Sequence, residues 1–433
     1  MEKSIEDALK VEGARVSLPV SAAITKAAFT PEFIRSAREN FSNFHFQMGG
    51  DHALYYAMHL EKFMPSAESA PNEEYKPLER NIKPEIRYIK QETSKGDLTL
   101  EEYMNDPLYR AQSIIMVHKG KVVYEDYPGM RPTDRHLTAS TGKITVGLVL
   151  TQLIEEGKVD LQKPITDYVP ELRGTVWDDI TTYSVANMTT GLDNEETMES
   201  ILQPDSAVTR FLASISGSPR ATTGEVEDWI DVARDQKKLP SGEKQGKVMR
   251  YASLNTTVLT RLIENIENKP FAEVFEERIW SKLHARRSMM FNLAPNGTAL
   301  PVGFAAVTTE DYARYGVMFT PSWNAVSSER IVDQDLLDII YNNVDKKRYV
   351  NSVKKPTSEK DFNDAAMGNA LQFDYIWDDG AIAKSGNLNQ MIYIDPKRDF
   401  VSVFFSTSPF VEGYGEFKAG AYQRAAAKML NGE

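Results

Sequence analysis

Short apolar runs bounded by polar turn residues lie in two well-separated parts of the chain. Residues 113–124 contain an apolar, β-branched run, a polar turn and a second apolar run, a pattern that predicts a β-hairpin. Residues 391–406 contain two further apolar runs on either side of a polar turn at 395–399. These runs predict two more antiparallel strands, and an alanine-rich helix is expected at 417–430.

The chain between these strands favours helices. Residues 140–156 carry apolar side chains on nearly every helical face, which is typical of a helix buried in a domain centre. Gly157 follows as a C-cap, and helices are also expected at 256–267 and 271–283. We therefore predict an α+β fold, in which an antiparallel sheet is flanked by terminal helices and a helical lobe at about 140–370 is inserted between the sheet-forming segments.

Residues 1–95 have a more polar and mixed pattern. Helical periodicity occurs near 31–34 and 53–64, and prolines at 71, 77 and 84 interrupt the segment that follows. We interpret residues 1–95 as an N-terminal extension and residues 96–433 as the main domain, and we expect the extension to shape the mouth of any pocket.

Composition narrows the classes of partner. The chain has 433 residues, a net charge of -12 and no cysteine. An acidic surface repels phosphate backbones, so we expect no nucleic-acid partner, and disulfides and thiolate chemistry are excluded. The first residues lack the pattern of a signal peptide, and no run approaches the ~20 apolar residues of a membrane span. We expect a soluble cytoplasmic or periplasmic protein, and a removed signal in a precursor stays open.

The histidines do not point to a metal site. No His-Glu-x-x-His pattern is present, so the zinc-hydrolase helix is missing. His45, His52 and His59 recur every seven residues and would share one face of a helix, where a packing stripe is more common than a metal site. The Gly-x-Ser-x-Gly turn of another hydrolase class is also absent. We expect neither a metal nor an organic cofactor.

An activated hydroxyl remains as a candidate nucleophile. Ser-x-x-Lys occurs at Ser140/Lys143, at Ser241/Lys244 and at Ser352/Lys355, and only the first pair opens the long apolar helix. Residues three apart share a helical face. Burial and the positive end of the helix dipole would lower the pKa of Lys143, so that a neutral amine could take the serine proton. The alternative is an N-capping serine followed by a surface lysine.

Two further segments carry candidate chemistry. Tyr251-Ala252-Ser253 precedes a predicted helix, and a tyrosine near two lysines would have a lowered pKa and relay protons. Lys384-Ser385-Gly386 lies on a predicted strand before Asn387, where a glycine lets a substrate approach the strand closely. Each segment alone is also compatible with an ordinary core residue or edge strand.

The order Ser-x-x-Lys, Tyr-x-Ser, Lys-Ser-Gly resembles the serine β-lactamase and penicillin-binding-protein superfamily. The long intervals between the motifs suit its class C and esterase branch. The resemblance covers residues 100–433 and implies a serine β-lactamase/DD-peptidase-like fold, with 96–433 as the catalytic domain. The flanking segments 155–161, 164–172, 188–193 and 311–316 are similar to the same family.

The resemblance also implies roles for individual residues. Ser140 would attack a carbonyl, Lys143 and Tyr251 would share the proton relay, and Lys384 would hold this relay electrostatically and face a substrate carboxylate. The backbone N–H groups of Ser140 and Asn387 match the oxyanion donors of such enzymes. Gly386 and Ser253 belong to the implied substrate-binding residues.

Ser253 stands where β-lactamases usually have asparagine. Tyr-x-Ser is similar to the branch that contains 6-aminohexanoate-dimer hydrolases and related esterases, which favours a small ester or linear amide. We therefore expect a serine hydrolase that acts on a small molecule through an acyl-enzyme on Ser140. A β-lactamase or D-Ala-D-Ala peptidase is one alternative, and a non-catalytic binding or assembly protein is another. The natural substrate and the oligomeric state stay open.

Overall fold

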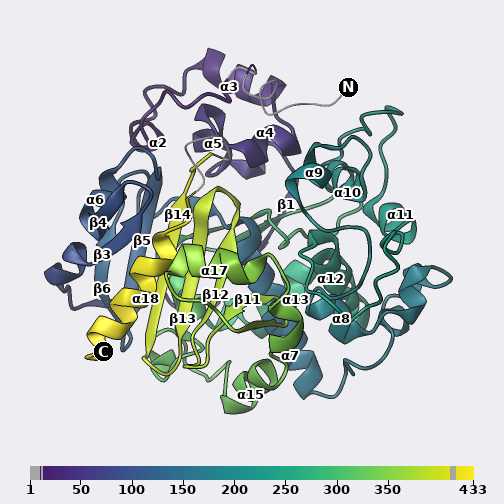
Figure 1. Cartoon of the computed structure of the whole chain (residues 1–433). Coiled ribbons are helices and arrows are strands. Elements are labelled where there is room, and N and C mark those ends of the chain that lie inside the picture. The colour runs from purple at the N-terminus through teal and green to yellow at the C-terminus, as the bar shows by residue number, and fades with distance from the viewer. Residues whose placement is uncertain (1–9, 11–12, 410–415) are drawn as a thin grey trace.

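The computed structural model describes residues 10, 13–409 and 416–433 of the chain (Figure 1). Its centre is an eight-stranded sheet, antiparallel except where β2 pairs with β6. The strands follow the order β10 (Gly368–Ala370), β11 (Phe373–Ile376), β12 (Ile382–Gly386), β13 (Gln390–Asp395), β14 (Phe400–Ser406), β5 (Ala111–His118), β6 (Lys121–Asp126) and β2 (Glu79–Arg80).

This sheet joins segments that are far apart in sequence. Strand β14 pairs with β5, so that Phe404 lies opposite Ile114. The predicted hairpin at 113–124 is β5–β6, and its turn residues Lys119 and Gly120 have φ of 50° and 72°. Positive φ at both positions is the conformation that tight two-residue hairpin turns require. The predicted antiparallel sheet is therefore confirmed, with both of its strand pairs as neighbours.

Two smaller sheets complete the β-structure. One has the order β1 (Ser66–Ser69), β8 (Met289–Asn292), β9 (Ala305–Thr308) and β7 (Arg135–Leu137), and the other is the hairpin of β3 (Lys90–Thr93) and β4 (Gly96–Thr99).

The helices surround these sheets. They are α2 (Ala22–Thr25), α3 (Pro31–Glu39), α4 (Asn43–Met48), α5 (Asp51–Tyr56), α6 (Leu100–Asn105), α7 (Lys143–Glu155), α8 (Thr182–Ala186), α9 (Met198–Leu202), α10 (Ala207–Ser216), α11 (Trp229–Arg234), α12 (Ser253–Glu267), α13 (Phe271–Arg278), α14 (Thr309–Val317), α15 (Gln334–Asn342), α16 (Lys346–Tyr349), α17 (Lys354–Phe362) and α18 (Ala419–Leu430).

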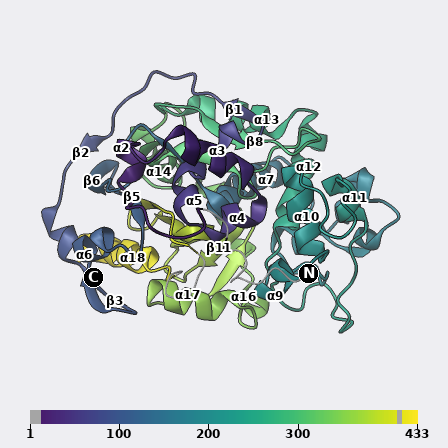
Figure 2. The same cartoon turned by 90° about the horizontal axis from the view of Figure 1, so that it is seen from above.

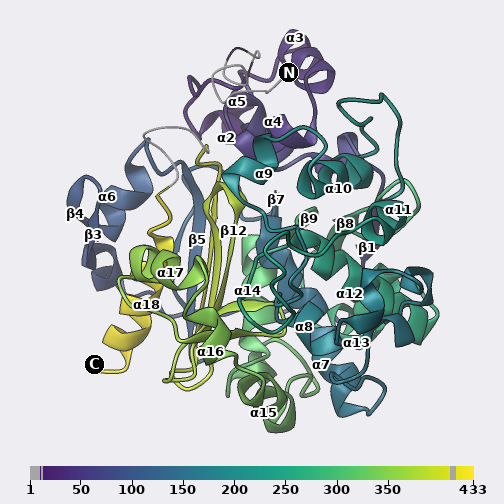
Figure 3. The same cartoon turned by 45° about the vertical axis from the view of Figure 1, so that its right-hand side comes forward.

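The large sheet lies between two helical layers. Helix α18 packs against β13, β14 and β5 on one face, and α14 packs against the same strands from the other (Figure 2). Helices α8 to α12 form a lobe beside the sheet (Figure 3). Helix α7 contacts α12, α15 and β11, and it therefore lies at the junction between the lobe and the sheet.

Several predicted boundaries change by a few residues. The helix expected to begin at Ser140 begins at Lys143, after a 3₁₀ turn at Ala139–Gly142. The helix expected at 271–283 ends at Arg278. The shared helical face of His45, His52 and His59 was a wrong expectation, because His45 lies on α4 and His52 on α5, and His59 follows both. Gly49 and Gly50 separate the two helices with φ of 84° and 99°, which lie outside the helical range of an L-residue.

Residues before 96 contribute strands to the eight-stranded and the four-stranded sheet. Strand β1 pairs with β8, and β2 pairs with β6. Helices α2 to α5 gather above the sheet (Figure 1), where the ring of Phe46 stacks on Phe304 with centroids 5.3 Å apart. In the part of the chain that the structure describes, no helix combines the length and apolar character needed to span a bilayer.

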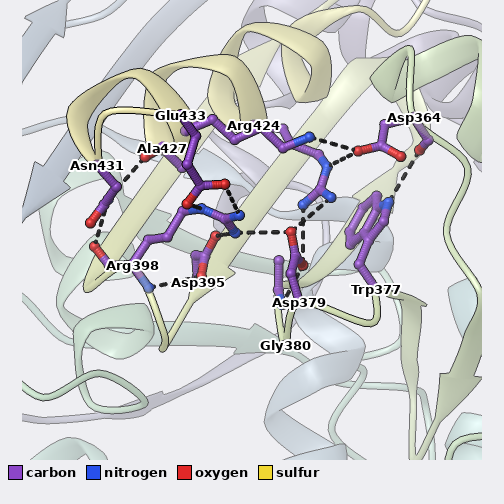
Figure 4. Close-up of polar contacts among 12 residues, drawn as sticks. Asp364, Trp377, Asp379, Gly380, Asp395, Arg398, Arg424, Ala427, Asn431 and Glu433 are labelled. Carbon is purple, nitrogen blue, oxygen red and sulfur yellow. Dashed lines mark hydrogen bonds and ion pairs between the residues drawn. The ribbon is translucent and has the colours of Figure 1, made fainter.

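A partly buried polar network ties the C-terminal helix to two strand turns (Figure 4). Arg398 pairs with Asp379 and Asp395 at 2.9 Å and with Glu433 at 2.6 Å. Arg424 pairs with Asp364 and Asp379 at 2.6 and 2.9 Å. The side chain of Arg398 is 6% exposed and that of Asp395 is 0% exposed. Removal of either partner therefore leaves the other charge buried and poorly solvated.

We expect Arg398→Ala to lower the free energy of unfolding by about 3 kcal/mol, because Asp395 would become a buried carboxylate without its main cation. Urea denaturation followed by circular dichroism measures this change. The matched control is Lys346→Ala, whose partner Asp378 is 76% exposed, and it should change stability by less than about 1 kcal/mol. Equal effects of the two substitutions would contradict the prediction.

Candidate active site

Ser140 lies on the short turn that precedes α7. Ala139, immediately before it, has a φ of 46°, a left-handed conformation that is strained for a residue with a Cβ and is frequent at functional sites. Two tyrosines of α14 secure this region, because Tyr312 donates a hydrogen bond to the carbonyl of Thr141 at 2.8 Å and Tyr315 donates to that of Ile144 at 2.9 Å. These two hydrogen bonds anchor the turn and the start of α7 to α14, while Ser140 stays partly exposed.

Lys143 directs its side chain at the serine from the first position of α7. Its Nζ lies 2.7 Å from Ser140 Oγ and donates to the carbonyl of Val302 at 2.6 Å. The residue is 0% exposed. Burial lowers the pKa of Lys143 to about 7, and the nearby cations Lys384 and Lys354 add to this effect. A substantial fraction of Lys143 is therefore neutral near pH 7 and has a lone pair for the serine proton.

Tyr251 lies close to three lysine side chains. The Nζ atoms of Lys354, Lys143 and Lys384 are 4.3, 5.0 and 5.1 Å from the centroid of its ring, and Ser140 lies close enough to influence the pKa of its hydroxyl. The expectation of a lowered tyrosine pKa was wrong. Burial raises the pKa of Tyr251 well above its ordinary value, and the carboxylates of Asp374 and Glu196 raise it further. Tyr251 is accordingly a protonated hydroxyl that can donate a hydrogen bond.

Lys384 projects from β12 towards the same ring. Its Nζ lies 2.5 Å from Asp374 Oδ1, and its side chain is 0% exposed. Burial lowers the pKa of Lys384 to about 8, although the Asp374 carboxylate acts in the opposite direction. The four residues that the sequence motifs single out, Ser140, Lys143, Tyr251 and Lys384, therefore meet at one place.

The end of β12 lies against the serine turn. A Cβ on Gly386 would come within 2.9 Å of the Ser140 backbone nitrogen, so a side chain at this position would displace the turn. The Nδ2 atom of Asn387 donates to the Gln47 carbonyl at 2.7 Å. Leu388 and Asn389 then adopt φ of 59° and 66°. Two consecutive left-handed residues without glycine mark another strained segment beside Ser140.

Ser140, Asn387 and Leu388 line a small pocket with a volume of about 40 Å³. Ser253, at the start of α12, lies on its wall and its backbone N–H donates to Glu196 Oε1 at 2.6 Å. Most of the remaining lining residues have apolar side chains. The lining residues are Phe46, Gln47, Leu137, Ala139, Ser140, Glu196, Leu212, Ile215, Ser253, Val302, Gly303, Phe304, Asn387 and Leu388.

Four residues at the site lie outside the sequence motifs. Glu196 and Gln47 line the pocket, and Asp374 and Lys354 form an ion pair beside Lys384. Asp374 stands in the otherwise apolar strand β11, and a carboxylate in a buried strand is a usable sequence signal. Lys354 lies next to Lys355 of the third Ser-x-x-Lys. The polar sequence around it gives no local signal that it belongs to the site.

Potential metal ligands gather elsewhere. Among the described residues, Glu155, Asp333 and Asp335 form the one group of three close ligand side chains, and they are largely exposed. None of them lines the pocket that contains Ser140.

Comparison with known proteins gives consistent matches. The model of the family described as Beta-lactamase matches residues 99–427. A 6-aminohexanoate-dimer hydrolase of Paenarthrobacter ureafaciens is 27% identical over 362 residues, which cover 81% of this chain and 84% of that protein.

Solved structures show the same fold. A Bacillus anthracis protein provisionally named as a 6-aminohexanoate-dimer hydrolase has a TM-score of 0.73 at 20% identity, covering 91% of this chain and 98% of that one. EstCE1, described as a hydrolase with promiscuous acyltransferase activity, has a TM-score of 0.52 at 14% identity, with coverage of 76% and 95%.

Proposed function

The chain belongs to the β-lactamase family of hydrolases, and from this membership we propose that it is a serine hydrolase that cleaves a small ester or linear amide through an acyl-enzyme on Ser140. The observation that carries the proposal is the distance of 2.7 Å between Lys143 Nζ and Ser140 Oγ. A buried amine with a lowered pKa is poised to accept a proton at this distance.

In the proposed acylation, the neutral Lys143 takes the hydroxyl proton while Ser140 Oγ forms a bond with the substrate carbonyl carbon. Negative charge develops on the carbonyl oxygen, and the backbone N–H groups of Ser140 and Asn387 are the proposed donors to it. Collapse of the tetrahedral intermediate expels the alcohol or amine, which receives the proton. Water then attacks the acyl-enzyme while Lys143 accepts its proton, the bond between the acyl carbon and Ser140 Oγ breaks, Lys143 returns the proton to Oγ, and a carboxylic acid leaves.

Tyr251 and Lys384 support these proton transfers in the proposal. The raised pKa of Tyr251 keeps its hydroxyl protonated, so it can hydrogen-bond Ser140 and hand a proton to the leaving group. The ammonium of Lys384 lies 5.1 Å from the tyrosine ring and stabilises negative charge that develops on the relay.

The pocket supports a small substrate with an apolar part. Its walls contain Phe46, Leu212, Ile215 and Phe304, and Ser253 occupies the place of the usual asparagine of β-lactamases. The relative from P. ureafaciens is named for hydrolysis of a 6-aminohexanoate dimer, which supports a linear amide among the candidate substrates. Ester and amide substrates share the acyl-enzyme step, so a reporter ester tests the proposal for both.

The test combines turnover with covalent labelling. The protein is mixed with a short-chain p-nitrophenyl ester, and product release and intact mass are followed together, with a fluorophosphonate probe as a second label. We expect a transient acyl adduct whose site maps by peptide mass spectrometry to Ser140. Folded protein that gives neither turnover nor a fluorophosphonate adduct would contradict the proposal and favour a binding role.

The activity should depend on pH in a bell shape. It should rise as Lys143, with a pKa of about 7, loses its proton and becomes a base. It should fall as Lys384, with a pKa of about 8, loses its positive charge. Measuring kcat/KM across pH reports the pKa values of these two groups in the free enzyme. A profile that is flat from about pH 5 to about pH 8 would contradict the role of Lys143 as base.

A further inference from the structure

Lys384 shares its carboxylate partner with a second lysine. Asp374 Oδ1 lies 2.5 Å from Lys384 Nζ, and Asp374 Oδ2 lies 3.0 Å from the Nζ of Lys354 on α17. The Asp374 side chain is 2% exposed and that of Lys354 is 15% exposed. A Lys–Asp–Lys array therefore spans β12, β11 and α17 with little access to water.

Both lysines of this array also face Tyr251. Lys354 Nζ is 4.3 Å and Lys384 Nζ is 5.1 Å from the ring centroid, which is within the range of a cation–π contact. Two ammonium groups in one desolvated site repel each other and would lose their charge without an anion. Asp374 supplies that anion between them.

We propose that Asp374 and Lys354 are positioning residues of the acylation site that act through Lys384. Asp374 keeps the Lys384 ammonium charged and directed at the Tyr251 ring. Lys354 binds the other oxygen of the same carboxylate and thereby limits how strongly Asp374 holds Lys384. This inference rests on the proposed function, because it assigns these two residues to the relay of that reaction.

The two residues have opposite electrostatic effects on Lys384. The Asp374 carboxylate raises the pKa of Lys384, whereas the Lys354 ammonium lowers it. Other ionisable groups face Lys384 or the array from the surrounding elements and stay unchanged in the variants proposed below. These groups are Lys143 on α7, Glu196 before α9, Tyr251 before α12, Asp361 on α17 and Tyr375 on β11.

The test measures the rate of fluorophosphonate inactivation against pH for the wild type, Lys354→Met and Asp374→Asn. Lys354→Arg keeps the cation, and Lys355→Met removes the neighbouring lysine of the same helix as a matched control. Circular dichroism and thermal unfolding establish that each variant is folded. The alkaline limb of the profile reports the loss of charge from Lys384.

We expect the alkaline limb to move in opposite directions in the two variants. Lys354→Met should move it to higher pH by about half a unit or more, because Lys384 keeps the anion and loses a repelling cation. Asp374→Asn should move it to lower pH by about one unit or more and lower the maximal rate at least about tenfold. In Lys354→Arg and Lys355→Met, the alkaline limb of the pH profile should stay at its wild-type position.

A structural role alone would lower the amount of folded protein without moving the limb. Unmoved limbs, or limbs that move in the same direction in both variants, would overturn the inference. If Asp374→Asn does not fold, the comparison of Lys354→Met with Lys354→Arg decides, and identical limbs in these two overturn it. A wild type without any adduct on Ser140 overturns the proposed function, and the inference with it, whereas normal labelling with unmoved limbs overturns the inference alone.

Discussion

Replacing Ser140 with alanine is expected to remove the acyl adduct and to lower kcat for a p-nitrophenyl ester by about 10⁴-fold or more, as the loss of an activated nucleophile does in other serine hydrolases. Oγ of Ser140 lies 2.7 Å from Lys143 Nζ at the pocket wall. Ser253 also lines the pocket, but it lies at the start of α12, where its backbone N–H donates to Glu196. Stopped-flow release of p-nitrophenol and intact mass measure the two effects.

The control for this prediction is Ser241→Ala. Ser241 opens the second Ser-x-x-Lys of the chain, in an exposed turn, and its loss should leave both turnover and adduct at wild-type levels. An adduct that persists in folded Ser140→Ala protein would show that another residue is the nucleophile.

Replacing Lys143 with methionine should lower kcat/KM by about 10³-fold, within the range that general-base catalysis contributes. Methionine removes the amine that lies between Ser140 Oγ and the Val302 carbonyl and retains an unbranched side chain for the buried site. The remaining activity should also lose the rise near pH 7, because the group that titrates there is gone. Steady-state kinetics across pH measure both changes.

Stability separates this effect from a folding defect. Lys143 is 0% exposed, and a hydrophobic replacement for a buried ionisable group is often neutral or stabilising. We therefore expect Lys143→Met to unfold at or above the urea midpoint of the wild type. The matched control is Lys244→Met in the exposed second motif, which should keep full activity. Wild-type acylation rates in Lys143→Met would contradict the role of this lysine as base.

The buried central helix and the paired strands are the parts of the fold that the amino-acid pattern predicts best. Residues 144–153 of α7 are fully buried except Gln152, and helices of this kind have apolar residues on every face. Apolar runs between turns likewise predict the hairpin β5–β6 and the strands β13 and β14. The spacing of three residues between Ser140 and Lys143 favours their contact, and the contact forms although Ser140 lies on the 3₁₀ turn before α7.

Other features depend on contacts between distant segments and leave little local signal. Strands β1 and β2 consist of Ser-Ala-Glu-Ser and Glu-Arg, which have low strand propensity, and they pair because β8 and β6 offer open edges. The pKa of Tyr251 depends on Asp374 and Glu196, whose proximity follows from tertiary structure alone. Lys354 enters the site for the same reason.

The hydrogen bond between Asn387 and Gln47 joins residues that are 340 positions apart, and Lys384 reaches Tyr251 only after β12 has joined the central sheet. During synthesis on the ribosome, Ser140 and Lys143 emerge long before these partners. The nascent chain therefore carries the proposed nucleophile without a finished pocket, and non-local pairing of this kind is slow. We therefore expect Ser140 to become reactive only at the last step of folding, when these distant partners have come together.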